Sequence, residues 1–205
     1  MLRSVFEAVM ERRARTLVEQ IRSWLPGEGP VLDLGSGTGH LSALVARELG
    51  LDVVTADVSD IHIVGPPPVL IGDGALPFAD KTFSAALLLF MLAYPSDPAG
   101  VLAEAARVTR GPVILVQSLH SSRLGYAWLR VREFLWTIAA FHVSRLVGYI
   151  PAKAKFSMNT RRFYTADTLQ RDVMAAGLRI RSRCERPILP GGSLRAAGWL
   201  LEVDA

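Results

Sequence analysis

Val31-Leu32-Asp33-Leu34-Gly35-Ser36-Gly37-Thr38-Gly39 is an apolar run that leads directly into three alternating glycines. Short apolar runs bounded by glycine are typical of buried strands, and the residues that follow, His40–Leu49, have the apolar spacing of a helix. Glycine lacks a Cβ and tolerates positive φ, so the backbone at a strand-to-helix turn can approach a bound ligand closely. The stretch therefore predicts a strand, a tight turn suited to ligand binding, and a helix.

Apolar runs and helical patterns alternate along the rest of the chain. Before the glycines, Ser4–Trp24 has helical spacing and ends at Pro26-Gly27. Further expected strands are 52–57, 69–71, 83–90, 113–117, 178–185 and 196–203, and further expected helices are 97–108, 121–150 and 166–176. We expect an α/β protein with a Rossmann-like, doubly wound, mostly parallel seven-stranded sheet and a helical insert after the fifth strand.

The length of the chain, 205 residues, is near the upper size of one ordinary domain. Hydrophobic residues make up 50% of it and charged residues 20%, as in globular α/β proteins. We therefore expect one domain over residues 1–205. Its expected parts are an N-terminal helix (1–27), a ligand-binding core (28–120), a helical insert (121–164) and a C-terminal helix with the final strands (165–205).

Cysteine content and charge exclude several classes of protein. The single cysteine, Cys184, excludes an internal disulfide, and no Cys/His pairs have zinc-ligand spacing, so we expect a cytoplasmic, metal-free protein. The N-terminus lacks a signal-peptide pattern, and the longest fully apolar run, 85–93, is far shorter than the ~20 residues of a membrane span. Residues 1–120 contain 9 Lys/Arg and 13 Asp/Glu, whereas residues 121–186 contain 13 Lys/Arg and 4 Asp/Glu. This asymmetry fits an anionic partner or a solvated basic face, and both readings stay open.

Three acidic residues lie at or after strand ends, where a nucleoside-like ligand would contact them. The glycine pattern has His40 where a dinucleotide-binding fingerprint has its third spaced glycine, and Asp33 would oppose a pyrophosphate but suit a cationic group. Asp57 ends the second expected strand, 22 residues after Gly35, where a carboxylate can accept both hydroxyls of a ribose. Asp73, after the third strand, can accept a hydrogen bond from an adenine amino group. The pattern favours a cationic adenosyl ligand over a dinucleotide.

Residues 28–120 resemble the class I S-adenosylmethionine-dependent methyltransferases, in particular the small-molecule group related to ubiquinone and menaquinone methyltransferases. The matching segments are Val31–Gly39, Asp57, Gly72–Phe78, Asp80-Lys81-Thr82-Phe83 and Asp97-Pro98. The resemblance implies S-adenosylmethionine as cofactor, with Asp33 near its amino group, Asp57 on the ribose and Asp73 on the adenine. The cofactor-binding residues that it implies are Asp33, Gly35, Ser36, Gly37, Gly39, Asp57, Val58, Asp73, Gly74 and Phe90.

The chain departs from the pattern of that family in three places. The fourth strand leads into Leu89-Phe90-Met91-Leu92-Ala93-Tyr94, where many relatives have one or two histidines. The usual Pro-Gly-Gly before the fifth strand is Arg110-Gly111-Pro112, and Gly74 follows Asp73 where many relatives have alanine. The first departure concerns catalysis more than cofactor binding, because in the family this strand end faces the reacting methyl group.

Methyl transfer from a sulfonium is an in-line displacement, so the main task of the enzyme is to align acceptor, methyl carbon and sulfur. A base is needed only where an acceptor hydroxyl must lose its proton, and a His or Tyr is the usual choice. The candidates are Tyr94 at the end of the fourth strand, His120 just past the fifth strand, and His142 or Tyr149 on the helical insert.

The insert from Ser121 to Ser157 carries two adjoining apolar stripes. One contains Leu124, Trp128, Val131, Leu135, Ile138, Leu146 and Tyr149, and the other contains Leu129, Trp136, Val143 and Val147. We expect the insert to cover a small, apolar acceptor, with core packing or a dimer interface as alternatives. Its arginines and tryptophans also fit peripheral contact with a membrane, and Arg161 and Arg162 then suit an anionic group on the substrate.

The sequence favours a methyltransferase that acts at oxygen or carbon of a small, apolar acceptor. The second hypothesis is an RNA methyltransferase, which the basic C-terminal half permits. The chain lacks an Asn/Asp-Pro-Pro-Tyr segment at the fourth strand, a pair of catalytic cysteines and an appended RNA-binding domain, so nucleic acid is not the expected partner. The third hypothesis is a non-catalytic protein that binds S-adenosylmethionine. The oligomeric state stays open.

Overall fold

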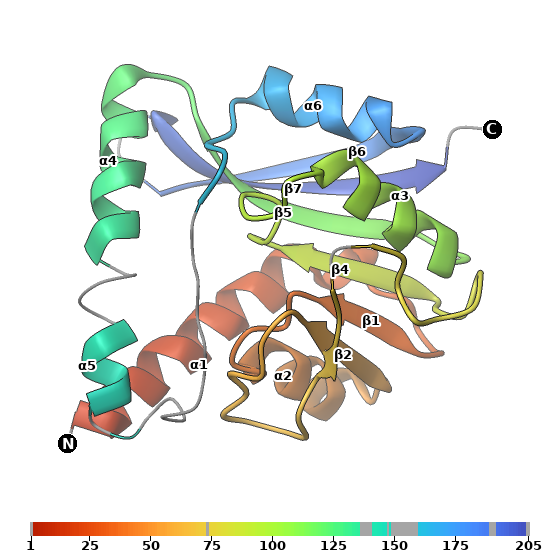
Figure 1. The fold of residues 1–205 in the computed structure, drawn as a ribbon, viewed down its shortest axis with the longest axis horizontal. Coiled ribbons are helices and arrows are strands. Elements are labelled where there is room, and N and C mark those ends of the chain that lie inside the picture. The colour runs from red at the N-terminus through yellow and green to blue at the C-terminus, as the bar shows by residue number, and fades with distance from the viewer. Residues whose placement is uncertain are drawn as a thin grey trace.

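The computed structural model describes residues 2–72, 74–135, 141–146, 148, 160–188 and 192–203. Within them, one seven-stranded sheet has the order β3-β2-β1-β4-β5-β7-β6 (Figure 1). The strands are β1 (Val31–Leu34), β2 (Val53–Asp57), β3 (Val69–Leu70), β4 (Ala85–Leu89), β5 (Val113–His120), β6 (Leu178–Pro187) and β7 (Leu194–Val203). The helices are α1 (Leu2–Ile21), followed by a short 3-10 helix (Arg22–Trp24), α2 (His40–Leu49), α3 (Pro98–Val108), α4 (Arg123–Phe134), α5 (Phe141–Leu146) and α6 (Ala166–Ala175). The expected mostly parallel, Rossmann-like sheet is confirmed.

The first five strands pair in parallel, and β7 runs antiparallel to both of its neighbours. β1 lies between β2 and β4, with Leu32 opposite Val54 on one side and Ala86 on the other. The chain order of the strands therefore reverses between β1 and β4. In open α/β sheets, ligands bind outside the carboxyl ends of the strands at such a reversal. The glycine turn after β1 and the loop after β4 both lie at this position.

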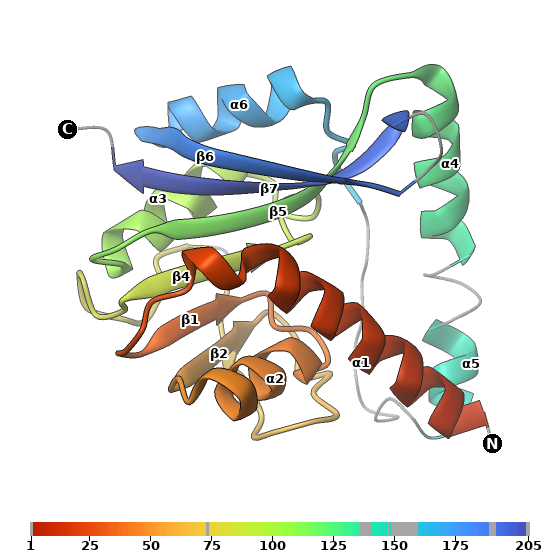
Figure 2. The same ribbon diagram turned by 180° about the vertical axis from the view of Figure 1, so that it is seen from behind.

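Alternate residues of the central strands belong to two separate cores. Ala86 and Leu88 of β4 belong to the core that contains residues of α3 and α6. Ala85 and Leu87 belong to the core that contains residues of α1 and α2. Figures 1 and 2 show these two pairs of helices on opposite faces of the sheet. Both faces of β4 are thus covered, which explains why its sequence is apolar without alternation.

The fourth strand is shorter than the expected 83–90. Phe90 has a φ of 59°, so the chain turns there, and Phe83 forms only an isolated bridge with Thr109. In the motif before β5, Gly111 has no room for a side chain, since a Cβ on it would lie 2.2 Å from the carbonyl oxygen of Ser84. Smaller differences are that β2 begins at Val53, β3 ends at Leu70, β6 continues to Pro187 and β7 begins at Leu194.

The fifth strand is longer than expected. It continues past Gln117 because the antiparallel ladder with β7 extends to the pair of His120 and Leu194. His120 is therefore the last residue of β5, and the expectation that it lies just past the strand was wrong. Thr165 caps α6, since its hydroxyl accepts a hydrogen bond from the backbone N–H of Thr168 at 3.3 Å.

The insert after β5 forms α4 and α5, which Figure 1 shows beyond the carboxyl ends of the strands, on the side to which the N-terminal half of α1 extends. The Ser122 hydroxyl caps α4 by accepting a hydrogen bond from the backbone N–H of Gly125 at 3.1 Å. Trp136, Tyr149 and residues 151–157 lie outside the described residues. None of the described helices is both long and apolar enough to cross a bilayer.

Candidate active site

The glycine turn after β1 is shaped by three positive φ angles. Gly35, Gly37 and Gly39 have φ of 81°, 57° and 81°. A Cβ on Gly35 would lie 2.8 Å from the Cβ of Met91, and one on Gly39 would lie 2.2 Å from the carbonyl oxygen of Val64. A Cβ on Gly37 would meet nothing within 4 Å. The two outer glycines therefore allow close packing within the protein, whereas Gly37 borders open space.

Asp33 is a buried acid in the strand below this turn. Its side chain is 2% exposed, and it accepts a short hydrogen bond from the Ser42 hydroxyl of α2. Burial raises the pKa of the Asp33 carboxyl to about 6, the bond from Ser42 opposes this rise, and the charge of Asp57 adds to it. A carboxylate in this state is stabilised by any cation placed near it.

Asp57 ends β2 and connects it to the glycine turn. One carboxylate oxygen accepts a hydrogen bond from the backbone N–H of Gly37 at 2.8 Å, and the other accepts one from the backbone N–H of Ser59 at 3.2 Å. Burial raises the pKa of this carboxyl against the effect of these bonds. The backbone N–H of Val58 also acts on this carboxylate, which has about four acceptor positions and so keeps capacity for a ligand donor. The neighbouring Val58 side chain is exposed.

A loop after β2 folds onto the glycine turn through His62, which the sequence reasoning missed. The His62 Nδ1 is 2.6 Å from the carbonyl oxygen of Pro66, which can only accept, so Nδ1 carries the proton. In the neutral ring Nε2 then accepts from the Ser36 hydroxyl at 2.8 Å. The backbone N–H of Ile63 also donates to the carbonyl oxygen of Thr38 at 3.1 Å. No sequence motif signals this contact, because it joins segments through loop geometry alone.

The segment after β3 is held by one arginine of α3. Arg107 donates hydrogen bonds to the carbonyl oxygens of Leu76 and Phe78, and forms ion pairs with Asp80 at 2.6 Å and Glu104 at 2.8 Å. Asp80, which belongs to one of the segments that match the family, thus helps to anchor this part of the chain. Asp73 lies outside the described residues, whereas Gly74 is described and exposed.

A cavity of about 140 Å³ lies at the ends of β4 and β5, next to α1, α4 and the segment that returns from the insert. Its lining residues are Arg13, Phe90, Ala93, Tyr94, Gln117, Ser118, Leu129, Arg132, Glu133, Thr160, Arg162, Phe163 and Tyr164. Sequence reasoning found Phe90, Tyr94 and Arg162 but missed most of the others. The lining residues come from five separate segments, and no single pattern in the sequence marks them.

Of the candidate bases, Tyr149 lies outside the described residues, and among the other three the structure brings only Tyr94 to the cavity. Burial raises the pKa of its phenol, and the charge of Glu133 raises it further. The His120 ring packs against Tyr126, with 5.4 Å between ring centroids, and is not part of the cavity wall. His142 lies on α5 with its side chain exposed.

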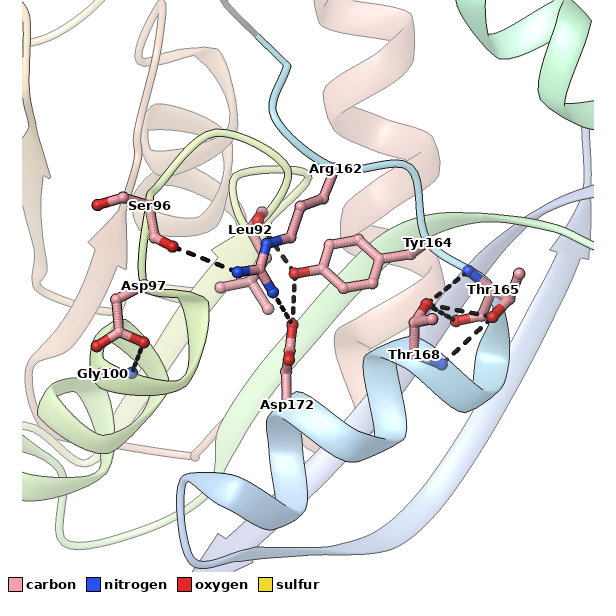
Figure 3. Close-up of polar contacts among 9 residues, drawn as sticks. All are labelled: Leu92, Ser96, Asp97, Gly100, Arg162, Tyr164, Thr165, Thr168 and Asp172. Carbon is pink, nitrogen blue, oxygen red and sulfur yellow. Dashed lines mark hydrogen bonds and ion pairs between the residues drawn. The ribbon is translucent and has the colours of Figure 1, made fainter.

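The wall of the cavity formed by residues 160–164 is tied to the loop after β4 and to α6, as Figure 3 shows. The Tyr164 hydroxyl donates a 2.8 Å hydrogen bond to Asp172 and lies 3.3 Å from the carbonyl oxygen of Leu92. Arg162 pairs with Asp172 at 3.3 Å and donates to the carbonyl oxygen of Ser96. The charge of Arg162 is therefore balanced within the protein.

Only one of the two apolar stripes of the insert faces inward on α4. Leu129 is 2% exposed and lines the cavity. The described residues of the other stripe, Leu124, Trp128, Val131, Leu135 and Leu146, are all exposed, Leu124 at 71%. These exposures contradict the alternative that this stripe packs into the core of the same chain. Among the residues that the structure describes, no group of three or more His, Cys, Asp and Glu side chains could hold a metal ion.

Comparison with known proteins identifies the family. A family profile described as "Methyltransferase domain" matches residues 6–183. The chain is 39% identical over 118 residues to a demethylmenaquinone methyltransferase of Renibacterium salmoninarum, a match that covers 53% of this chain and 49% of that protein. It thus spans about half the length of this curated relative.

Solved structures share the fold. The [4+2]-cyclase SpnF has a TM-score of 0.63 at 15% identity, covering 94% of this chain and 81% of that one. A geranyl diphosphate methyltransferase in complex with SAM has a TM-score of 0.60 at 12% identity, covering 94% and 84%. Likeness at such low identity concerns the fold and not the reaction. Taken with the match over residues 6–183, the chain belongs to the methyltransferase domain family, in the class I group of S-adenosylmethionine-dependent enzymes.

Proposed function

We propose that this chain transfers the methyl group of S-adenosylmethionine to a small acceptor held in the 140 Å³ cavity. The observation that carries this proposal is that one loop borders two sites. After β4, Met91 packs against Gly35 of the glycine turn, while Phe90 and Tyr94 line the cavity. A cofactor on the glycine turn and an acceptor in the cavity would therefore meet at this loop.

The residues at the carboxyl edge of the sheet fit this cofactor. The ammonium group of its methionine part would offset the cost of ionising buried Asp33, and Asp57 keeps acceptor capacity for a ribose hydroxyl. Gly37 leaves space where the ligand must approach. When bound, the cofactor supplies an electrophilic methyl carbon on a sulfonium. The further proposed contacts are Gly35, Ser36, Gly39, Val58, Asp73, Gly74 and Phe90.

Within the cavity, we assign to Tyr94 the contact with the acceptor. Because its pKa is raised by burial, Tyr94 is a neutral phenol at pH 7 and donates a hydrogen bond. Such a bond orients an acceptor oxygen toward the loop after β4, where alignment for in-line transfer is the main requirement. His120 and His142 lack this placement, so we give them no role in the transfer.

The acceptor that suits the cavity has a partly apolar body. Phe90, Leu129 and Phe163 provide apolar wall, in a volume that fits one aromatic ring with its substituents. The relative from Renibacterium salmoninarum is named for demethylmenaquinone, which contains such a ring. We propose a ring-containing acceptor methylated at oxygen or carbon, with residues 121–164 acting as its cover. The acceptor–methyl bond forms as the sulfur–methyl bond breaks, S-adenosylhomocysteine leaves, and the displaced proton passes to the Glu133 carboxylate of the cavity wall.

We also propose that the exposed stripe of α4 contacts a membrane surface. Leu124, Trp128, Val131 and Leu135 recur at helical spacing and are exposed, and Arg123 and Arg130 on the same helix are exposed beside them. Apolar side chains flanked by arginines are typical of helices that lie on anionic bilayers. This position would bring the cavity close to an acceptor dissolved in lipid.

Turnover of the cofactor tests the proposed reaction. The protein is incubated with S-adenosylmethionine and a panel of reduced demethylmenaquinones and hydroxylated aromatic compounds, and S-adenosylhomocysteine is quantified by mass spectrometry. We expect acceptor-dependent product with at least one compound. Tyr94→Phe should lower the rate about tenfold through loss of one hydrogen bond. Tyr126→Phe, whose ring lies outside the cavity wall, is the matched control. Cofactor binding without turnover across the panel would contradict the proposal.

A further inference from the structure

Two arginines that line the cavity have no acidic partner in an ion pair among the described residues. They are Arg13 of α1 and Arg132 of α4. Arg13 lies over the Phe90 ring, 5.2 Å from its centroid, and Arg132 donates to the Ser118 hydroxyl at 3.3 Å. These are weak partners for two guanidinium groups that stay charged at all ordinary pH values.

The surroundings of these two arginines disfavour their charges. Although both side chains still reach solvent, the protein packed around each head lowers its pKa, and the charge of Arg132 lowers that of Arg13 further. One carboxyl, Glu133, lines the same cavity, and burial raises its pKa. Residues 134–166 contain no Asp or Glu at all, so the rest of the insert supplies no acid to balance them.

Polar side chains with buried atoms that lack a hydrogen-bond partner complete the cavity wall. Gln117 is 4% exposed, and its Oε1 has no hydrogen-bond partner among the described residues. The Glu133 Oε1 and the Thr160 hydroxyl are also buried without a partner within hydrogen-bond geometry, although the Thr160 hydroxyl is near enough to the Tyr94 phenol to oppose the rise of its pKa. Buried polar atoms are almost always paired in proteins, so such a cluster points to a ligand that supplies the partners.

We propose that the acceptor carries an anionic group, a carboxylate or a phosphate, which Arg13 and Arg132 bind together near the carboxyl end of β5. Guanidinium groups bind both anions through paired hydrogen bonds. Gln117 and Thr160 bind the remaining polar atoms, Glu133 accepts from any hydroxyl of the acceptor, and Phe90 and Phe163 contact its apolar body. This inference rests on the proposed function, since it names the class of molecule that occupies the same cavity.

Binding of matched acids and neutral compounds tests the inference. The protein saturated with S-adenosylhomocysteine is titrated with 4-hydroxybenzoate and its neutral counterpart 4-hydroxybenzamide, and with phenyl phosphate and phenol, and the dissociation constants are measured by calorimetry. We expect at least one anion to bind about tenfold or more tightly than its neutral counterpart, because a hydrogen bond to a charged group exceeds a neutral one by about this factor. The compound pair with the larger ratio of the two dissociation constants, neutral over anionic, shows whether the cavity prefers a carboxylate or a phosphate.

Charge-removing variants assign the effect to the two arginines. Arg13→Gln and Arg132→Gln should each reduce the preference for the anion about tenfold or abolish it. Arg12→Gln is the control, because it removes the same charge from the same helix but lies outside the cavity wall. Equal binding of acids and neutral compounds, no binding of either anion at millimolar concentration, or the same loss in Arg12→Gln would overturn the inference. The affinity for S-adenosylhomocysteine, measured in the same samples, separates these outcomes from failure of the cofactor site.

Discussion

Asp33 shows how one buried side chain can link stability to cofactor binding. It lies in β1 below the glycine turn, and burial raises its pKa from 3.8 to about 6. A group whose pKa is raised by folding stabilises the folded protein fully below its unfolded value and loses that contribution as the pH rises through its folded value. The carboxylate at neutral pH is therefore costly to the protein without ligand and is available to a cation.

We predict that the free energy of unfolding falls between about pH 4 and pH 6 by roughly 3 kcal/mol because of Asp33, and that Asp33→Asn removes this part of the slope. Bound S-adenosylhomocysteine should also flatten the slope in the unmodified protein, because its ammonium group offsets the charge. Urea unfolding at several pH values, with and without ligand, measures both effects. An identical slope in Asp33→Asn would show that another group titrates.

Gly37 and Gly39 have the same sign of φ but different surroundings. Alanine at either position pays the cost of a left-handed backbone, about 1 kcal/mol. At Gly39 the Cβ also meets the carbonyl oxygen of Val64 at 2.2 Å, so we predict that Gly39→Ala lowers the free energy of unfolding by at least about 2 kcal/mol more than Gly37→Ala. Gly37→Ala should instead weaken S-adenosylhomocysteine binding, because its Cβ enters the space left for the ligand. Equal destabilisation by both changes would contradict this assignment.

At the scale of elements, the site depends on how the chain returns from the insert. Residues 160–164 pass the ends of β4 and β5 before α6 begins, and the backbone N–H of His120 donates to the carbonyl oxygen of Tyr164 at 2.9 Å. The Tyr164 side chain, 1% exposed, connects Leu92 of the loop after β4 to Asp172 of α6 (Figure 3). One side chain thus joins the 160–164 segment and the loop after β4, which both line the cavity, to α6.

We predict that Tyr164→Phe lowers the free energy of unfolding by about 1–3 kcal/mol, because it removes a buried hydrogen bond to a charged group. Tyr126→Phe should change stability by less than about 0.5 kcal/mol, since that side chain is partly exposed. Chemical denaturation of both variants makes the comparison. If the two variants were equally stable, the hydroxyl of Tyr164 would have no part in holding the segment.

At the scale of the whole molecule, acidic and basic residues are divided unevenly between the two parts of the chain. The acids that we assign to the cofactor, Asp33, Asp57 and Asp73, all lie in the first 120 residues. The basic part includes the insert, whose α4 combines exposed apolar side chains with arginines. Placed against an anionic bilayer, this surface would leave the cofactor side of the molecule in water.

We predict that the protein co-sediments with phosphatidylglycerol vesicles but not with phosphatidylcholine vesicles, and that Leu124→Glu reduces the bound fraction severalfold by placing a charge in the apolar stripe. Met174→Glu is the control, because Met174 is similarly exposed on α6. A dimer in light scattering that Leu124→Glu dissociates, without vesicle binding, would show instead that the stripe joins two copies of the chain.

Short-range sequence patterns were enough to predict the individual strands, helices and turns around the cofactor site. The strand, glycine turn and helix at residues 31–49, the acid at the end of β2 and the alternation of strands and helices along the chain all follow from short-range spacing. Periodicity also predicted both stripes of the insert, but it could not tell which of them faces inward.

The cavity was beyond prediction for a different reason. Arg13, Gln117 and Arg132 come from α1, β5 and α4, and only tertiary packing brings them together. Likewise, Phe90 gave no sign of its positive φ, since an aromatic residue at the end of an apolar run is ordinarily part of the strand.

Titration calorimetry with S-adenosylhomocysteine tests the cofactor site most directly. We predict saturable binding to the unmodified protein and no binding of NADH. Asp57→Ala should weaken binding of S-adenosylhomocysteine by about tenfold or more, because a charged acceptor of ribose hydroxyls is lost. Asp52→Ala, at the exposed amino end of the same strand region, should bind as the unmodified protein does. No binding of S-adenosylhomocysteine, or equal affinity in Asp57→Ala, would contradict a cofactor site at the carboxyl edge of β1 and β2.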